Sequence, residues 1–95
     1  MIEVSVRKDG ITISGHSGYA PPGQDIVCAG VSTLAQTLIS SIEDLTQDKI
    51  TYSVSPGRAD INYGNLSEKS QTLVDSFFVG ICAIVNGWSD YVRVV

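Results

Sequence analysis

One histidine and one cysteine, twelve positions apart, are the residues of this sequence best suited to covalent chemistry. His16 is the only histidine, and Cys28 is one of two cysteines. A thiolate attacks carbonyl carbon and a thiol hardly does, so a nucleophilic cysteine needs a lowered pKa or a base that takes its proton. An imidazole accepts that proton and later donates one to a leaving group. The pair therefore indicates nucleophilic catalysis, if the fold brings the two side chains together.

A helix is predicted to hold Cys28 close to its N-terminus. Asp25 is suited to be the N-cap, because its carboxylate can accept hydrogen bonds from the amides of the first turn. Cys28 is then the third helical residue, where the positive end of the helix dipole favours a thiolate. We expect the first-turn amides to serve also as oxyanion donors. The helix should end near Thr46, because apolar residues recur until then at steps of three or four: Val27, Val31, Leu34, Leu38, Ile42 and Leu45.

Two further polar residues belong to this candidate site. Asp25 can either cap the helix or orient the imidazole of His16. Direct contact of its carboxylate with Cys28 is disfavoured, because a negative charge there would raise the pKa of the thiol. Ser32 lies four residues after Cys28, on the same helical face, so its hydroxyl can reach the nucleophile or a substrate carbonyl.

A strand and a loop must carry His16 to the helix. Apolar and polar residues alternate from Ile2, and Asp9-Gly10 is typical of a tight turn. The alternation resumes at Ile11 and ends at Gly15-His16, which predicts a hairpin. The segment from residue 17 to 24, SGYAPPGQ, is then an exposed loop. In this loop Tyr19 and Gly23 are candidate substrate-binding residues, although Tyr19 can equally anchor the loop and Gly23 can be an ordinary turn residue.

The rest of the chain predicts a second hairpin, a second helix and a final strand. The hairpin spans residues 50–63 with a turn at Pro56-Gly57, and the last strand spans residues 91–95. The helix starts at a capping box over residues 65–68, with Asn65 as its cap, and stops at Asn86-Gly87. The order β-β-α-β-β-α-β favours a single α+β domain over residues 1–95, with one sheet of about five strands and both helices packed on it. The order of strands within the sheet stays open.

Other residues in the sequence have simpler structural interpretations. Cys82 is expected to be a packed core thiol, because Phe78, Ile81 and Val85 surround it at helical spacing. Phe77, Phe78 and Trp88 are expected in the core. Structural interpretations also exist for the candidate pair: cysteine is often a small buried hydrophobe, and a lone histidine on a strand is often only a surface residue.

Composition narrows the partners and the compartment. The 95 residues carry six basic and ten acidic side chains, a net charge of −4, so the chain lacks the basic face that nucleic acids and anionic membranes attract. Neither is expected as a direct partner. The longest apolar stretch, around residues 77–85, is interrupted by Gly80 and is too short to span a membrane. The alternating N-terminal residues do not form a signal peptide, so a cytoplasmic protein is expected.

No motif in the sequence predicts a metal or a cofactor. Paired Cys-x-x-Cys or His-x-x-x-His elements, which would suit a metal ion, are absent, and the glycines near His16 are not followed by the lysine of a phosphate-binding loop.

The stretch from Gly15 to Ser32, GHSGYAPPGQDIVCAGVS, resembles the signature of Prp, the ribosomal-processing cysteine protease family found in some bacteria. The match comprises Gly15-His16 before a glycine-containing loop, then Gly23, the run Asp25–Ala29, and Ser32. The predicted element order and the ending Asp90-Tyr91-Val92 are also similar, so the resemblance spans the chain, strongly in the motif and loosely after Thr46.

The resemblance implies a homodimeric cysteine endopeptidase that removes the N-terminal extension of a large-subunit ribosomal protein, cutting after an aromatic residue. Cys28 would be its nucleophile and His16 its base. Gly15, Asp25 and Ser32 would support the site, and the loop at residues 17–24 would be a mobile cover. Pro21-Pro22 departs from the family pattern, which bears on loop mobility and sequence preference rather than on the chemistry.

The main alternative is a module that binds ribosomal proteins or assembly intermediates without catalysis, because a fold does not guarantee an activity. Alkylation separates the two hypotheses. An enzyme should have a Cys28 that reacts with iodoacetamide much faster than Cys82 does and that slows when His16 is replaced by alanine.

Overall fold

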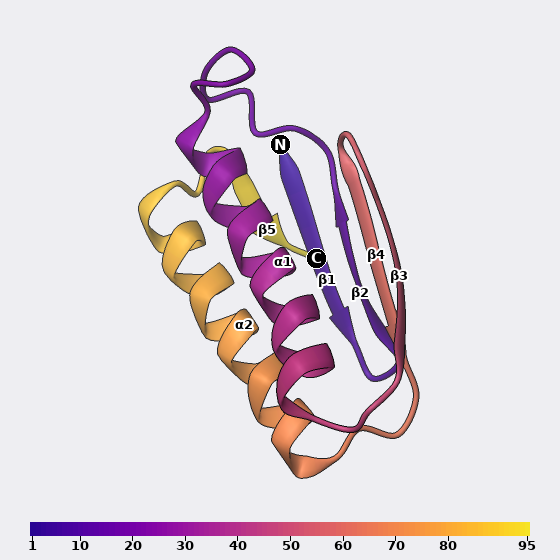
Figure 1. Ribbon diagram of the computed structural model, residues 1–95. Coiled ribbons are helices and arrows are strands. Elements are labelled where there is room, and N and C mark those ends of the chain that lie inside the picture. Colours follow the sequence, from indigo (N-terminus) through magenta and orange to yellow (C-terminus); the bar gives the residue numbers. More distant parts are fainter.

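Alternating apolar and polar residues build the centre of a five-stranded sheet (Figure 1). In this computed structural model, which describes residues 1–95, β1 (Ile2–Arg7) and β2 (Gly10–Ser14) pair antiparallel, with Val4 opposite Ile13. Val4 and Ile11 are fully buried on the face that the helices cover. The predicted first hairpin is therefore present, and β2 ends two residues before His16.

The sheet order is β3-β4-β2-β1-β5. The second hairpin consists of β3 (Ile50–Ser55) and β4 (Arg58–Tyr63), and β4 pairs with β2 at the centre of the sheet. The short β5 (Val92–Val94) runs parallel to β1 along the opposite edge. The turn between β3 and β4 consequently lies beside the end of β2, where Gly15 donates its backbone N–H to the Gly57 carbonyl at 2.9 Å.

Two helices cover one face of the sheet, as Figure 1 shows: α1 (Ile26–Leu45) and α2 (Glu68–Gly87). The core between the layers comprises Ile2, Val4, Ile11, Ile13, Val27, Val31, Ala35, Leu38, Ile39, Ile42, Ile61, Tyr63, Val74, Phe77, Ile81 and Val92. The predicted α+β fold and element order β-β-α-β-β-α-β are confirmed. Burial of these apolar side chains is the main force that holds α1 in its place on the sheet.

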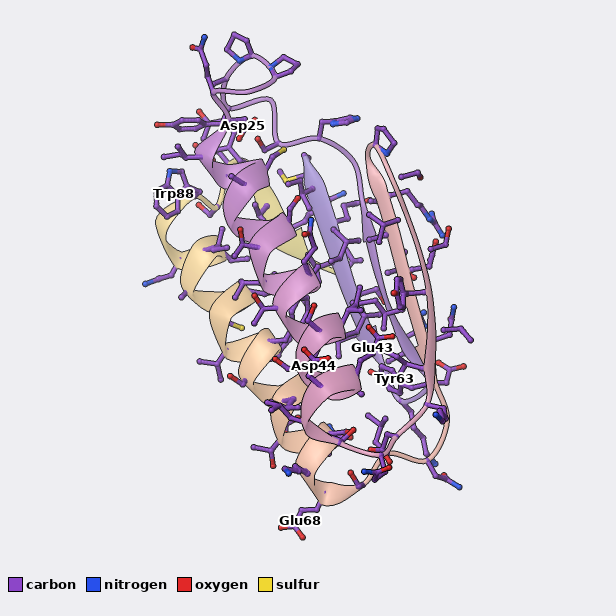
Figure 2. All side chains as sticks on the ribbon, viewed as in Figure 1. Asp25, Glu43, Asp44, Tyr63, Glu68 and Trp88 are labelled. Atoms are coloured by element: carbon purple, nitrogen blue, oxygen red, sulfur yellow. The ribbon has the colours of Figure 1, made fainter.

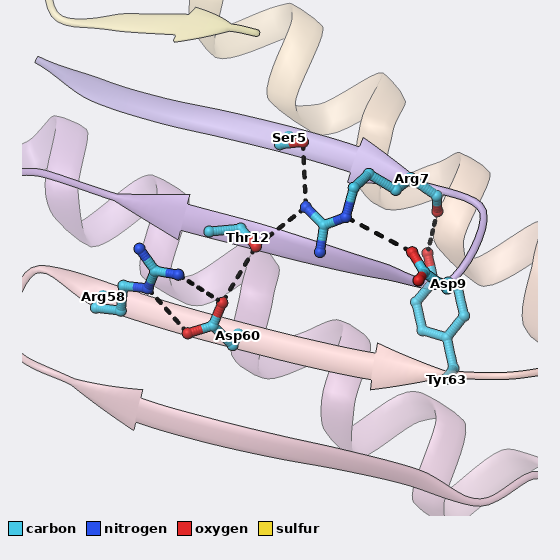
Figure 3. Close-up of polar contacts among 7 residues, drawn as sticks. All are labelled: Ser5, Arg7, Asp9, Thr12, Arg58, Asp60 and Tyr63. Carbon is cyan, nitrogen blue, oxygen red and sulfur yellow. Dashed lines mark hydrogen bonds and ion pairs between the residues drawn. The ribbon is translucent and has the colours of Figure 1, made fainter.

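The opposite face of the sheet carries a polar network, which Figure 3 shows. Arg7 donates to Thr12 at 3.1 Å, and Thr12 donates to Asp60 at 3.1 Å. Asp60 also accepts two hydrogen bonds from Arg58, at 2.9 and 3.1 Å. This pairing fixes the Arg58 side chain at the start of β4.

The predicted cap of the second helix was wrong. Ser67, not Asn65, is the N-cap of α2, and its hydroxyl accepts a hydrogen bond from the Ser70 N–H at 3.3 Å. Asp48 selects Ser67 by accepting from both its backbone N–H and its hydroxyl, at 2.9 and 2.7 Å. A partner nineteen residues away thus decides which of two cap-forming residues begins the helix.

Three residues expected in the core, two in α2 and one at its C-cap, are exposed. Phe77 is buried, but Phe78 and Trp88 are each 37% exposed, and Cys82 is exposed as well. Each residue of a helix turns by about 100° from the previous one, and the buried stripe of α2 follows Val74, Phe77 and Ile81. Phe78 and Cys82 each follow a residue of that stripe and so point away from the sheet.

By length and composition alone, α1 and α2 are each apolar enough to cross a membrane, although the sequence pattern had suggested that no apolar stretch was long enough. This is weak evidence, because a helix that packs one side on a protein core passes the same test. Here each helix buries one stripe of apolar side chains in the core described above.

Candidate active site

Asp25 caps α1, as predicted, and this fixes the position of Cys28 (Figure 2). One carboxylate oxygen accepts from the backbone N–H groups of Val27 and Cys28, at 3.0 and 2.9 Å. Hydrogen bonds from the Ser17 hydroxyl and from backbone amides lower the pKa of Asp25 to about 2. The carboxylate is therefore ionised at neutral pH, and Cys28 occupies the third position of the helix, half-buried.

Ser17 joins the loop to the cap and to the cysteine, and the sequence reasoning missed this residue. Its side chain is only 4% exposed. Its hydroxyl donates to the second carboxylate oxygen of Asp25 and accepts from the Tyr19 N–H at 3.1 Å. The Cys28 thiol donates to the same hydroxyl oxygen, with 3.6 Å between Sγ and Oγ. The only signal in the sequence was a hydroxyl residue directly after the candidate base.

His16 lies just beyond β2, exposed, with its imidazole against the turn between β3 and β4. A Cβ built on Gly57 would lie 2.6 Å from the His16 Nε2 atom, so a side chain at this position would displace the ring. No hydrogen bond joins His16 to Cys28 or to Asp25 in this structure. The contacts of Asp25 are those of a helix cap, and the alternative that it orients the imidazole finds no contact here.

A cleft of about 170 Å³ opens between α1 and the ends of β2 and β4. Cys28, His16 and Ser32 all line it, and most of its other walls are apolar: Ile2, Ile13, Val31, Ala35, Ile39, Val54 and Ala59. The same three polar residues also line a more open hollow under the loop, between Gly18 and the start of α1. The predicted catalytic and supporting side chains therefore border one continuous surface.

The three predicted residues in or beside the loop have different surroundings. Gly15 has a φ of 98°, in the left-handed region that favours glycine, and a Cβ there would run into the Met1 carbonyl. Gly23 lines the hollow under the loop. Tyr19 packs edge-on against Tyr91, with ring centroids 5.2 Å apart, and does not line the cleft or the hollow. In this arrangement Tyr19 is an anchor of the loop.

The amides of the first helical turn are mostly occupied, contrary to the expectation that they are free to bind an oxyanion. Val27 and Cys28 donate to the Asp25 carboxylate, and Ala29 donates to the Asp25 carbonyl at 3.1 Å. The cap that positions the cysteine thus consumes these donors. The groups that the site does offer are a thiol, an imidazole and two hydroxyls, and no group of three metal-ligating side chains lies close together.

The fold matches three crystal structures over nearly their whole length. The essential ribosomal processing protease Prp from S. aureus, with a covalently linked product peptide, gives a TM-score of 0.88 at 20% identity, covering 98% of this chain and 94% of that one. The same protease with a substrate peptide gives 0.78 at 18% identity, covering 99% and 95%. SMU.848 from Streptococcus mutans gives 0.79 at 27% identity, covering 98% and 89%.

Two comparisons of the sequence complete this picture. No curated protein matches the chain. The model of a protein family described as cysteine protease Prp matches residues 1–93. Because that match spans nearly the entire chain, this protein belongs to the cysteine protease Prp family.

Proposed function

We propose that this cysteine protease uses Cys28 as its nucleophile and His16 as its general base. The observation that carries the proposal is the position of Cys28. It is the third residue of a capped helix, half-buried, in the wall of a cleft that His16 also lines. The cleft gives a peptide access to the sulfur, and His16 in the lining of the same cleft is the base that can take the thiol proton.

The reaction follows from these two groups. His16 takes the thiol proton, and the sulfur attacks the scissile carbonyl carbon. The carbon–nitrogen bond then breaks as His16 gives its proton to the leaving amine, which leaves a thioester on Cys28. Water, deprotonated by His16, attacks the thioester and regenerates the thiol together with the new carboxyl terminus.

This chemistry requires the imidazole to move from its position in the structure. The ring now packs against Gly57 and makes no hydrogen bond to Cys28. His16 is exposed and follows the end of β2, so its side chain can turn toward the cleft without disturbing the core. Catalytic hydrogen bonds often tighten only once substrate is bound. We propose that a peptide in the cleft brings the imidazole and the thiol together.

The walls of the cleft suit an apolar side chain next to the scissile bond. Val31 and Ala35 form one wall on α1, and Val54 and Ala59 form the other on β3 and β4. Val54 is 55% exposed, so it can be replaced without unfolding the protein. Val54→Glu should raise KM for a peptide with an aromatic residue before the cut and leave the alkylation rate of Cys28 nearly unchanged. An unchanged KM would argue against this wall as a binding surface.

The proposed substrate is the precursor of a large-subunit ribosomal protein that carries an N-terminal extension. The matching S. aureus protease is a ribosomal processing protease, and the charge of −4 on this chain suits a basic substrate. We further propose a cytoplasmic homodimer, in which reducing conditions keep the thiol free. Light scattering of the purified protein under reducing conditions tests the dimer directly.

Intact-mass spectrometry of the precursor, incubated with the wild-type protein, Cys28→Ala or His16→Ala, tests the function. One defined N-terminal cut, made by the wild type and lost in both variants, would support the dyad and identify the bond. A cut that His16→Ala still makes at the wild-type rate would remove His16 from the mechanism. Binding without any cut, under reducing conditions and at several pH values, would favour the binding module instead.

A further inference from the structure

Ser17 has hydrogen bonds in every direction that its hydroxyl allows. A hydroxyl has one proton to donate and two lone pairs that accept. The proton of Ser17 goes to Asp25, whose ionised carboxylate can only accept. The two lone pairs face the Tyr19 N–H and the Cys28 thiol, at 3.1 and 3.6 Å. In this arrangement Ser17 has no proton left to offer to the sulfur.

The direction of the bond from Cys28 decides which form of the sulfur is favoured. The thiol donates its proton to Ser17, whereas a thiolate would face lone pairs on the same oxygen. A hydrogen bond to the neutral form of a group disfavours its ionisation. For a thiolate to gain a donor, the Ser17 hydroxyl would have to turn its proton away from Asp25, which lowers the number of hydrogen bonds on that carboxylate.

The loop is part of the same unit. The Tyr19 N–H holds Ser17 from the loop side, and the Ala20 N–H donates to Asp25 at 3.4 Å. Ser17 itself is buried, so its hydroxyl is shielded from water. A displacement of the loop therefore removes Ser17 from the sulfur, while the amides of Val27 and Cys28 keep Asp25 in place as the cap.

We propose that Ser17 is a positioning residue that holds the Cys28 sulfur protonated as long as the loop keeps the Ser17 hydroxyl against it. The inference rests on the proposed role of Cys28 as the nucleophile. Ser17 acts through the hydrogen bond that it accepts from the Cys28 thiol.

Other charged or titratable groups surround Cys28, and replacing Ser17 alters the hydrogen bonding of one of them, Asp25. Asp25 lies at the cap, His16 lies across the cleft, and Arg58 lines the cleft while paired with Asp60. The α-amino group of Met1 donates to the His16 carbonyl at 2.6 Å. A difference between the wild type and a Ser17 variant therefore reports on the hydroxyl together with its hydrogen bond to Asp25, and substitution of Asp25 separates the two.

The test is the pH dependence of Cys28 alkylation by iodoacetamide, measured in a Cys82→Ala background because Cys82 is exposed. Ser17→Ala should move the midpoint down by roughly half a pH unit to one unit, the size expected for the loss of one hydrogen bond. Ser40→Ala, an exposed serine further along α1, is the matched control and should leave the midpoint in place. An unchanged or higher midpoint in Ser17→Ala would overturn the proposal.

A second variant keeps the test decisive if Ser17→Ala folds poorly. Asp25→Asn retains an oxygen for the helix amides but offers an N–H to Ser17, which frees the hydroxyl proton for the sulfur. It also removes a negative charge, so the same substitution is made in the Ser17→Ala background as well. The downward shift should be larger with Ser17 present than with alanine there. Equal shifts in both backgrounds would mean that only the charge matters and would overturn the proposal.

These measurements do not depend on cleavage. If the precursor is not cut but the midpoints move as expected, the proposed function fails and the role of Ser17 stands. If cleavage proceeds and the midpoints do not move, the reverse holds.

Discussion

The N-termini of the two helices are capped by similar groups but have different roles. At α1 the cap is Asp25, held by the hydroxyl of Ser17. At α2 the cap is Ser67, held by the carboxylate of Asp48. In both, the cap residue accepts from first-turn amides, and a serine hydroxyl donates to an aspartate that is apart from it in sequence. The aspartate is the cap of α1 and the serine is the cap of α2, and Asp25 accepts from two helix amides where Ser67 accepts from one.

The third residue of each helix makes the difference. In α1 it is Cys28, half-buried and open to the cleft. In α2 it is Ser70, 0% exposed, whose hydroxyl donates to Thr46 at 3.2 Å, just beyond the end of α1. A capped helix N-terminus is therefore a structural device in one place and a candidate active site in the other. What distinguishes the two is a nucleophile with an open cleft beside it, not the helix dipole alone.

The largest expected effect on activity comes from replacing the proposed nucleophile at the N-terminus of α1. Cys28→Ser should reduce cleavage of the precursor by at least about 10³-fold, because loss of a nucleophile removes the covalent route.

Ser70→Cys, in a chain that lacks Cys28 and Cys82, places a thiol at the equivalent position of α2. That thiol should stay nearly inert to iodoacetamide because it is buried. Rapid alkylation of this thiol in the folded protein would show that a position at a capped helix N-terminus is enough to make a cysteine reactive.

The next effect concerns His16, which has no counterpart near α2. Gly57→Ala should lower kcat/KM for a peptide substrate by roughly 10- to 100-fold, because a methyl group beside His16 restricts how the imidazole turns toward the cleft, and a misplacement of about 1 Å can cost that much. Because φ at Gly57 is 74°, an alanine at this position also has a locally strained backbone. Gly64→Ala is the control, because a Cβ there meets nothing within 4 Å. If both variants lose activity equally, the contact between His16 and Gly57 has no role.

Low pH should reduce the stability that Asp25 and Asp48 contribute at the N-termini of the two helices. Hydrogen bonds from Ser17 and from backbone amides lower the pKa of Asp25 to about 2, and the nearby Ser70 hydroxyl together with the hydrogen bonds from Ser67 lowers the pKa of Asp48. A lowered carboxyl pKa contributes stability that is present above the unfolded value, 3.8, and is lost as pH falls through the folded value.

Urea unfolding at several pH values checks this expectation. The midpoint for the wild type should fall as pH drops from about 4 toward 2, and Asp25→Asn and Asp48→Asn should each flatten that fall. A dependence that is as steep in both variants as in the wild type would assign acid sensitivity to other carboxylates.

The smallest expected effect separates stability from reactivity. Ser67→Ala removes the cap of α2 and should lower the free energy of unfolding by about 1 kcal/mol. The pH midpoint of Cys28 alkylation should not change, because the two helix ends share no hydrogen-bonded partner. A shifted midpoint would reveal coupling between the ends through the packed helices.

Short-range features of the chain could be read from the sequence. Asp25, Cys28 and the apolar steps of α1 lie within one or a few helical turns, so hydrogen bonding and periodicity specify them locally. The alternation of Ile11 and Ile13 likewise predicted which side of β2 is buried. The order of elements follows from such local signals placed one after another along the chain.

Tertiary structure decided the rest, because it depends on partners far apart in sequence. The strand order brings Gly57 beside His16, and no local pattern encodes that pairing. The loop folds back so that Ser17 meets Asp25 and Cys28, which turns an ordinary loop serine into a buried partner of the thiol. Cys82 is exposed for the same reason: an apolar helix face is buried only where another layer covers it, and the sheet covers only one stripe of α2.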